Sequence, residues 1–280
     1  GGDVIRLKLS RRTDIMKIGF IGLGNMATAM IGGMLQKGIA KPEDIIGSSK
    51  TETTAEKVKT KFNINTTTDN KTVAAQADVL FLAVKPIFFP EVIAEIRETV
   101  RPETLIVSIA AGRTLDYLKE AFGRPEVKLI RCMPNTPALV LEGCTGVCVG
   151  ENVTEEELEK VLTLLRSFGI ASVVPERLMD VVVGVSGSSP AYVFMFIEAM
   201  ADEAVAAGMP RKQAYEFAAQ SVLGSARMVL ETGRHPGELK DMVCSPGGTT
   251  IQAVRVLEEK GFRSAVIEAQ TECVKKARGM

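Results

Sequence analysis

Short apolar runs alternate with segments of helical periodicity along residues 16–175. The first apolar run, residues 18–21, leads into the sequence GLGNMA at residues 22–27. Apolar residues then recur at helical spacing, at Met26, Met30 and Met34. The order strand, glycine turn and helix is the context in which a G-x-G-x-x-A motif predicts a dinucleotide-binding turn.

The residues of this turn suit a pyrophosphate. Gly22 allows a tight turn, Gly24 has no side chain to keep a ligand from the backbone, and Ala27 lets the helix pack close to the strand. The N–H groups at a helix start also attract phosphates. We therefore predict a cofactor-binding turn, with an ordinary glycine turn of an α/β protein as the alternative.

Seven further strands are predicted, each as a short apolar run. They are expected at residues 44–47, 64–67, 78–84, 105–109, 127–131, 145–149 and 171–174. The periodicity between them predicts helices at residues 53–62, 72–76, 89–99, 115–122 and 155–168. This alternation predicts an α/β fold, with a doubly wound Rossmann dinucleotide-binding domain over residues 16–175.

The pattern changes at Glu176, after which no further strand is predicted. Helices are expected at residues 178–185, 191–207, 211–231, 249–259 and 264–278. Two segments, 191–207 and 214–230, are hydrophobic nearly all round, so each is expected to be buried on most faces. An all-α domain over residues 176–280 with such helices needs a partner surface. We therefore predict self-association through these helices, as a dimer or a higher oligomer.

Composition narrows the classes of protein. Of 280 residues, 46% are hydrophobic and 24% charged, and 34 basic residues balance 34 acidic ones. The zero formal charge gives no electrostatic reason to expect nucleic acid or a membrane surface as partner. No stretch approaches the ~20 consecutive apolar residues of a membrane helix.

The N-terminal residues and the cysteines also indicate how the protein is processed and where it is located. Residues 1–15 precede Met16 and lack a long apolar core, so we interpret them as a non-native leader, not a secretory signal. The five cysteines are odd in number and show no C-x-x-C spacing. We infer free thiols in a reducing cytoplasm and no metal site.

Polar residues follow several predicted strands at the carboxyl edge of the sheet, where ligands of open α/β sheets bind. The second strand runs into Ser48, Ser49 and Lys50, whose hydroxyls and ammonium suit a 2′-phosphate. We therefore favour NADPH, while Glu52 nearby leaves NADH open and a plain polar loop is the alternative. Lys85 follows another strand and is well placed to touch cofactor or substrate, unless it is simply a solvated loop lysine.

A second candidate for anion binding lies in the helical domain. Residues 243–250, VCSPGGTT, open the predicted helix at 249–259. Glycines and hydroxyls at a helix start form a cradle of backbone N–H groups. Such a cradle suits a small carboxylate substrate, but Thr249 and Thr250 are also good N-cap residues, so a plain capped helix start remains equally open.

Six segments together resemble the Δ1-pyrroline-5-carboxylate reductase family, from about Met16 to Arg278. They are FIGLGNMA at 20–27, LFLAVKP at 80–86, IAAG at 109–112, RCMPNTP at 131–137, GVSGSSPAY at 184–192 and HPGELKDMVCSPGGTTIQAVRVLE at 235–258. The resemblance implies an NAD(P)H-binding domain followed by a helical dimerisation domain. It also implies proline biosynthesis by hydride transfer to the C=N carbon of a cyclic imine. Ser189 departs from the glycine that many relatives carry, with only a local effect expected.

The resemblance also implies roles for single residues. The pyrophosphate would meet the turn at Leu23, Asn25 and Met26, and the adenosine ribose and its phosphate would meet Ser49 and Asn70 beside Ser48. The nicotinamide side would be lined by Val84, Lys85 and Ala111. The substrate carboxylate would be held by Ser245 and the backbone of Gly248 and Thr249, with Glu176 facing the same pocket. Thr250 would hydrogen-bond the ring nitrogen.

This chemistry needs no strong general acid, because solvent can protonate the imine before it binds. Most of the rate would come from holding the nicotinamide against the ring. The single histidine, His235, precedes a proline in a turn, so we expect a turn or interface role for it.

Two alternatives remain open. β-Hydroxyacid dehydrogenases use a helix lysine that the segment 191–207 lacks. A non-catalytic NADP-binding sensor would not need the SPGGTT cradle.

Overall fold

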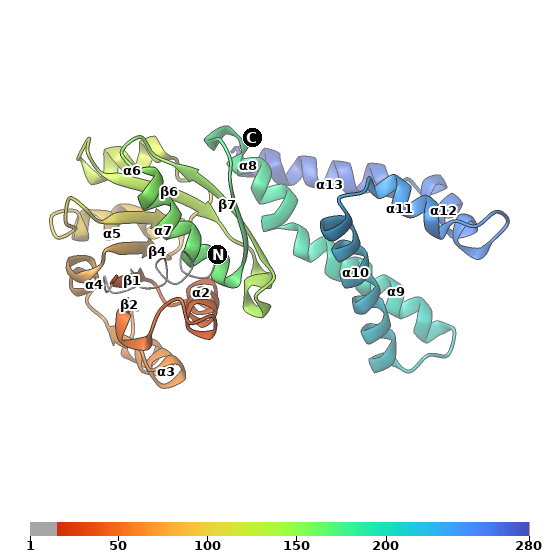
Figure 1. The fold of residues 1–280 in the computed structure, drawn as a ribbon, viewed down its shortest axis with the longest axis horizontal. Coiled ribbons are helices and arrows are strands. Elements are labelled where there is room, and N and C mark those ends of the chain that lie inside the picture. The colour runs from red at the N-terminus through yellow and green to blue at the C-terminus, as the bar shows by residue number, and fades with distance from the viewer. Residues whose placement is uncertain (1–15, 280) are drawn as a thin grey trace, which may run out of the picture. The chain divides into compact units, whose positions relative to one another are not determined.

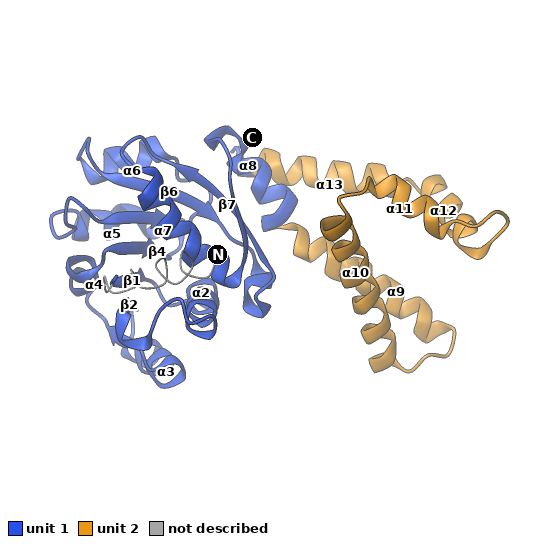
Figure 2. Ribbon diagram, viewed as in Figure 1, with its two compact units in different colours: residues 1–187, 277–280 blue, residues 188–276 orange. Residues whose placement is uncertain are grey.

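The structure is a computed structural model that describes residues 16–279. The expectation that residues 1–15 are a non-native leader lies outside these residues. The chain forms two compact units, coloured separately in Figure 2. Unit 1 runs to Gly187 and includes the chain end from Ala277, and unit 2 is Ser188–Lys276. The domain boundary between residues 175 and 176 stays a prediction.

An eight-stranded sheet forms the centre of unit 1, in the order β3-β2-β1-β4-β5-β6-β7-β8 (Figure 1). Each strand matches one of the predicted apolar runs. The strands are β1 (Ile18–Ile21), β2 (Ile45–Ser48), β3 (Asn65–Thr67), β4 (Val79–Leu82), β5 (Leu105–Ser108), β6 (Lys128–Met133), β7 (Gly143–Val149) and β8 (Gly169–Val173). The order reverses between β1 and β4, which is the topological switch point where open α/β sheets bind ligands.

One strand pair departs from the parallel pattern. β6 and β7 are antiparallel, whereas the other neighbouring pairs are parallel. The connection between them, residues 134–142, is shorter than the dozen or more residues that a parallel crossover requires. The chain therefore returns beside β6 in the opposite direction.

Helices cover both faces of the sheet, which confirms the doubly wound prediction. One face packs against α2 (Asn25–Gln36), α3 (Glu52–Phe62) and α7 (Glu155–Leu165). The other face packs against α4 (Asn70–Gln76), α5 (Phe89–Ile96) and α6 (Leu115–Phe122). Successive residues of β4 alternate between the two cores, so a strand buried on both faces is continuously apolar.

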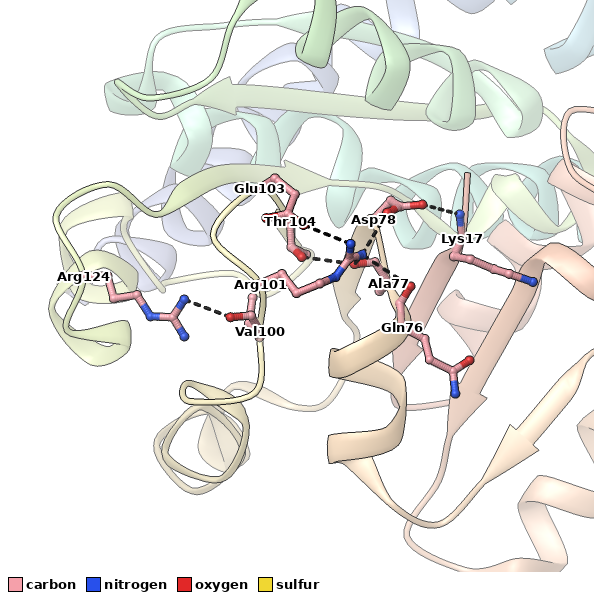
Figure 3. A network of polar contacts seen from close by, with 9 residues as sticks. All are labelled: Lys17, Gln76, Ala77, Asp78, Val100, Arg101, Glu103, Thr104 and Arg124. Atoms are coloured by element: carbon pink, nitrogen blue, oxygen red, sulfur yellow. Dashed lines mark hydrogen bonds and ion pairs between the residues drawn. The ribbon is translucent and has the colours of Figure 1, made fainter. Parts of the chain in front are cut away.

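A polar network closes the amino edge of the sheet, where β1, β4 and β5 begin (Figure 3). The Asp78 carboxylate accepts the backbone N–H of Lys17 at 2.8 Å and pairs with the Arg101 guanidinium at 2.8 Å. Arg101 and the Thr104 hydroxyl both donate to the Ala77 carbonyl, at 2.8 and 3.1 Å. The network joins three strand starts at the edge opposite to the expected ligand site.

Replacing Asp78 by alanine is expected to lower the free energy of unfolding by about 1–3 kcal/mol, because it leaves two donors without their acceptor. Urea denaturation measures this loss. Glu103→Ala is the matched control, since Glu103 also pairs with Arg101, at 3.0 Å, but its side chain is 63% exposed. Equal losses in the two variants would contradict the role assigned to Asp78.

Unit 2 is helical throughout, with no strand among its residues. Its helices are α9 (Ser189–Ala206), α10 (Arg211–Thr232), α11 (Pro236–Val243), α12 (Thr249–Glu259) and α13 (Phe262–Ala277). α11 was not predicted from the sequence, because it is short and lies between two turn sequences. The helix predicted at 178–185 is split into α8 (Met179–Val182) and a π-helical turn, Val183–Gly187.

The apolar faces of α9 and α10 are largely uncovered in the single chain. Only Ala201 of α9 and Ala214 and Ala218 of α10 are buried, while Met195 is 70% and Leu230 75% exposed. The expectation that these helices are buried on most faces is therefore wrong for one chain alone.

One helical run also differs from the expectation about membrane helices. The segment Glu176–Ala206 is a run of 31 residues whose most apolar 18-residue part has a mean hydropathy of 1.4, enough to cross a membrane by length and composition. Valine, phenylalanine and isoleucine side chains keep this average high, although glycines, serines and Pro190 interrupt the apolar run. Only 11% of its most apolar part is buried. One such helix is weak evidence for a membrane span, because core helices of soluble proteins have the same length and composition.

Candidate active site

The glycine turn between β1 and α2 has the geometry of a phosphate site. Gly22 has φ +99°, and a Cβ there would lie 2.8 Å from the carbonyl carbon and oxygen of Ala83. Gly24 is the N-cap of α2, with φ −78° and no side-chain cap. A Cβ at Gly24 would meet no atom of the chain within 4 Å. The start of α2 therefore presents backbone N–H groups beside an open surface.

The side chains around the turn divide between core and surface. Leu23 is 5% exposed and packs on Gly47, where a Cβ would lie 2.5 Å from Leu23 Cδ2. Leu23 can thus line a pyrophosphate only through its backbone. Asn25 is exposed and Met26 half-buried in the first turn of α2, while Ala27 is buried against the sheet.

The polar residues after β2 are mostly engaged within the chain. The buried Ser48 hydroxyl donates to Asn70 Oδ1 at 2.7 Å, and the Ser49 hydroxyl donates to the Thr51 carbonyl at 2.7 Å. Lys50 is exposed, and its ammonium lies 5.0 Å from the centroid of the Phe88 ring. Of Ser48, Ser49 and Lys50, only Lys50 therefore presents its polar group to solvent.

Two residues that contact this polar group, Glu95 and Phe88, could not be predicted as its neighbours because they lie far along the chain. Asn70 Nδ2 donates to Glu95 Oε2 at 3.2 Å, and Phe88 lies beneath Lys50. No local pattern pairs these residues with the end of β2, since they come from α5 and the turn before it.

The loops after β4 and β5 are neighbours at the carboxyl edge. Val84 is half-buried, Lys85 exposed and Ala111 exposed. The Arg113 guanidinium joins the two loops by donating to the Pro86 carbonyl at 2.9 Å. The structure thus brings the three predicted nicotinamide residues to adjacent loops.

Glu176 lies in unit 1, beside the start of α6. Its Oε2 accepts the backbone N–H of Leu115 at 2.8 Å and pairs with Arg131 Nη1 at 2.9 Å. Glu176 and Arg131 border a cavity of about 450 Å³ whose lining also includes Gly112 and Thr114. From the sequence, Arg131 was noted only as part of the segment RCMPNTP that resembles the family. Its ion pair with Glu176 was therefore not predicted.

The second anion-binding candidate lies in unit 2, as a turn followed by α12. The Gly248 N–H donates to the Ser245 carbonyl at 3.0 Å, and Gly247 has φ +69°. Pro246 and Gly247 thus occupy the central positions typical of a type II turn.

The threonines of this turn do not cap the helix, which was the alternative to an anion-binding role. Gly248, and neither threonine, is the N-cap of α12, and it has no side-chain cap. The hydroxyls of Ser245, Thr249 and Thr250 form no hydrogen bond among the described residues. They are therefore available to a ligand at this helix start.

Within the described part of the chain, neither the histidine nor the cysteines form a second candidate site. His235 Nδ1 accepts the Gly237 N–H at 2.9 Å and so caps the start of α11. All five cysteines are free thiols, and burial raises the pKa of Cys148 to about 11. Among residues 16–279, no three His, Cys, Asp or Glu side chains are grouped to hold a metal ion.

Comparison with known proteins covers both units together. The pyrroline-5-carboxylate reductase of Escherichia coli strain K12 is 56% identical over 261 residues, spanning 93% of this chain and 97% of that protein. The chain belongs to the pyrroline-5-carboxylate reductase family. The Methanosarcina acetivorans member is 46% identical over 253 residues, spanning 90% of this chain and 93% of that protein.

Two family models match different parts of the chain. The model for pyrroline-5-carboxylate reductase dimerisation matches residues 176–280. The model described as NADP oxidoreductase coenzyme F420-dependent matches residues 17–112. The chain therefore combines a dinucleotide-binding Rossmann domain with the family's dimerisation domain.

Solved structures of the reductase family share the whole fold. The enzyme from Coxiella burnetii has a TM-score of 0.88 at 34% identity, covering 95% of this chain and 98% of that one. The Plasmodium falciparum enzyme, solved with NADP bound, has a TM-score of 0.84 at 32% identity, covering 94% and 97%.

Proposed function

We propose that this chain reduces Δ1-pyrroline-5-carboxylate to L-proline, with hydride transferred from NADPH to the C=N carbon. The observation that carries the proposal is the 56% identity to a named reductase across both domains. The open turn at Gly24 and the unbonded hydroxyls beside Gly248 supply one site of the required chemistry in each unit.

The N-terminal residues fit an NADP cofactor. The backbone at Gly22, Leu23, Gly24, Asn25 and Met26 would hold the pyrophosphate at the start of α2, where the helix dipole favours negative charge.

The adenosine end would meet Ser48, Ser49 and Asn70, which shape the end of β2, with Lys50 facing a 2′-phosphate. Val84, Lys85 and Ala111 would form the wall against the nicotinamide, which supplies the hydride when bound.

The C-terminal turn would orient the substrate. The Ser245 hydroxyl and the backbone N–H of Thr249 would bind its carboxylate, as helix starts bind anions. Gly248, whose N–H closes the turn on the Ser245 carbonyl, would take part through its lack of a side chain and not as a donor. The Thr250 hydroxyl would then hydrogen-bond the ring nitrogen, fixing the imine carbon toward the hydride donor. A protonated ring nitrogen makes that carbon a better hydride acceptor, and solvent can supply this proton before binding.

Self-association accounts for the uncovered helices of unit 2. The exposed apolar faces of α9 and α10 lie within the segment that the dimerisation model matches. A second copy of the chain would cover them, in a cytoplasmic enzyme with neither a nucleic acid nor a membrane as partner.

The test is the loss of NADPH absorbance in the near ultraviolet when Δ1-pyrroline-5-carboxylate is added, with proline identified as product. The assay is repeated with NADH. A folded dimer that binds NADPH but gives no turnover with either cofactor would contradict the proposal and favour an NADP-binding sensor.

Replacing Lys50 by glutamate is expected to lower kcat/KM for NADPH about tenfold relative to NADH, because the exposed charge would repel the 2′-phosphate. The ratio of the two values is the measurement. Lys57→Glu makes the same charge change on the exposed surface of α3 and should keep the wild-type ratio. An unchanged ratio in Lys50→Glu would remove Lys50 from cofactor choice.

A further inference from the structure

A single carboxylate joins three elements of unit 1 beside the loop that follows β5. Glu176 Oε2 accepts the N–H of Leu115 at 2.8 Å and the Nη1 donor of Arg131 at 2.9 Å. The Arg131 side chain is 5% exposed, and its Nε is buried without a hydrogen-bond partner. Glu176 is thus the anionic partner of an almost fully buried guanidinium.

The contact to Leu115 fixes one end of the loop at residues 109–114. Leu115 is the first residue of α6, and the other end of the loop is held where the Ala110 N–H donates to the Ser108 hydroxyl at 3.2 Å. Between these anchors, Ala111 and Gly112 are exposed at the carboxyl edge of the sheet. This is the edge at which a dinucleotide lies in such folds.

We propose that Glu176 and Arg131 are positioning residues that hold the loop 109–114 in the shape that receives the nicotinamide. In this role Glu176 acts through Leu115 and the loop, which replaces the place facing the substrate that the family resemblance implies for it. The inference rests on the proposed function, because it takes the residues around Ala111 to be the wall of the nicotinamide site.

The physical argument is the cost of removing one partner. Without the Glu176 charge, the guanidinium of Arg131 stays buried without an anion, which is strongly unfavourable. The Leu115 N–H also loses a charged acceptor at the first turn of α6, where a carboxylate is favourable. Relaxation of either group moves the end of the loop.

Glu176 also lies at the start of the segment that the dimerisation model matches. It is the first residue matched by the dimerisation model, and it is followed by α8, whose Val182 packs on Gly146 of β7. The start of the helical segment thus reaches the cofactor loop through one side chain.

The chain contains a matched control on the same strand. Glu157 pairs with Lys128 at 2.6 Å and accepts the N–H of Thr154 at 3.0 Å at the start of α7. Lys128 is the first residue of β6, at the edge opposite to the loop. The control pair thus has the same chemistry, a carboxylate that joins a β6 cation to a helix start, without the contact to the loop.

The experiment compares Glu176→Gln and Arg131→Met with Glu157→Gln and Lys128→Met in the full chain. NADPH affinity is measured by fluorescence, kcat and both KM values by steady-state assay, and stability by thermal unfolding. The kinetic isotope effect is measured with NADPH deuterated at the transferred position. We expect Glu176→Gln and Arg131→Met to lose about tenfold in NADPH affinity and in kcat, with a larger isotope effect and an unchanged KM for the imine.

The controls and the conservative variant decide the interpretation. The Glu157 and Lys128 variants should lose stability but keep the wild-type kinetics. Arg131→Lys should restore part of the NADPH affinity, and it replaces Arg131→Met if that variant does not fold. A raised KM for the imine with intact NADPH affinity in Glu176→Gln would overturn the inference, as would equal kinetic losses in the control variants. Absence of turnover in the wild type would instead contradict the proposed function, while NADPH affinity would still test the pair.

Discussion

Gly24→Val is expected to abolish NADPH binding while unit 1 stays folded. The backbone at Gly24 has φ −78° and ψ −170°, which any residue can adopt, and a Cβ there meets no atom of the chain within 4 Å. A valine side chain would instead occupy the space beside the α2 N–H groups, where the pyrophosphate must approach the backbone. The substitution should therefore lower the affinity for NADPH and leave the stability of the fold unchanged.

The measurement is NADPH titration by fluorescence, with thermal unfolding of the same sample. Gly22→Val is the contrasting variant, because its φ of +99° and the 2.8 Å approach to Ala83 leave no room for a side chain. We expect it to destabilise the fold itself. Wild-type affinity in a folded Gly24→Val protein would refute the assignment of this turn.

Thr250→Ala is expected to lower kcat about a hundredfold with little change in stability, as removal of one preorganised hydrogen bond does in other active sites. The Thr250 hydroxyl has no hydrogen-bond partner among the described residues, so the folded chain loses no contact of that group. The substrate would lose the group that fixes its ring nitrogen.

Steady-state kinetics and urea denaturation test this together. Thr250→Ser keeps the hydroxyl and should retain most of the turnover. Thr271→Val removes a hydroxyl that bonds the Ile267 carbonyl in α13 and controls for a general effect on unit 2. Unchanged turnover in Thr250→Ala would remove Thr250 from the mechanism.

Local periodicity was sufficient to predict the architecture. The eight strands follow from apolar runs of strand length, and the helices between them follow from spacing. The direction of β7 was missed because direction depends on the length of the connection from β6, not on the strand itself. The helix α11 was missed because eight residues carry too little periodicity.

The candidate site was predictable only where its residues are adjacent in sequence. The turn at Gly24 and the turn at Gly248 each lie within one short motif, so their local geometry could be predicted. The contact of Arg131 with Glu176 joins residues 45 positions apart, and that of Ser48 with Asn70 joins residues 22 apart. Spacing also does not determine which way a side chain points, as the buried Leu23 shows.

The exposure of Lys50 has a consequence for evolution. The hydroxyls of Ser48 and Ser49 are tied into the fold, so changes there would cost stability, whereas Lys50 forms no ion pair among the described residues. Under the proposed contact of Lys50 with the 2′-phosphate, one surface substitution would shift the preference between the phosphorylated and unphosphorylated dinucleotide. Cofactor choice in this family would then diverge faster than the fold that carries it.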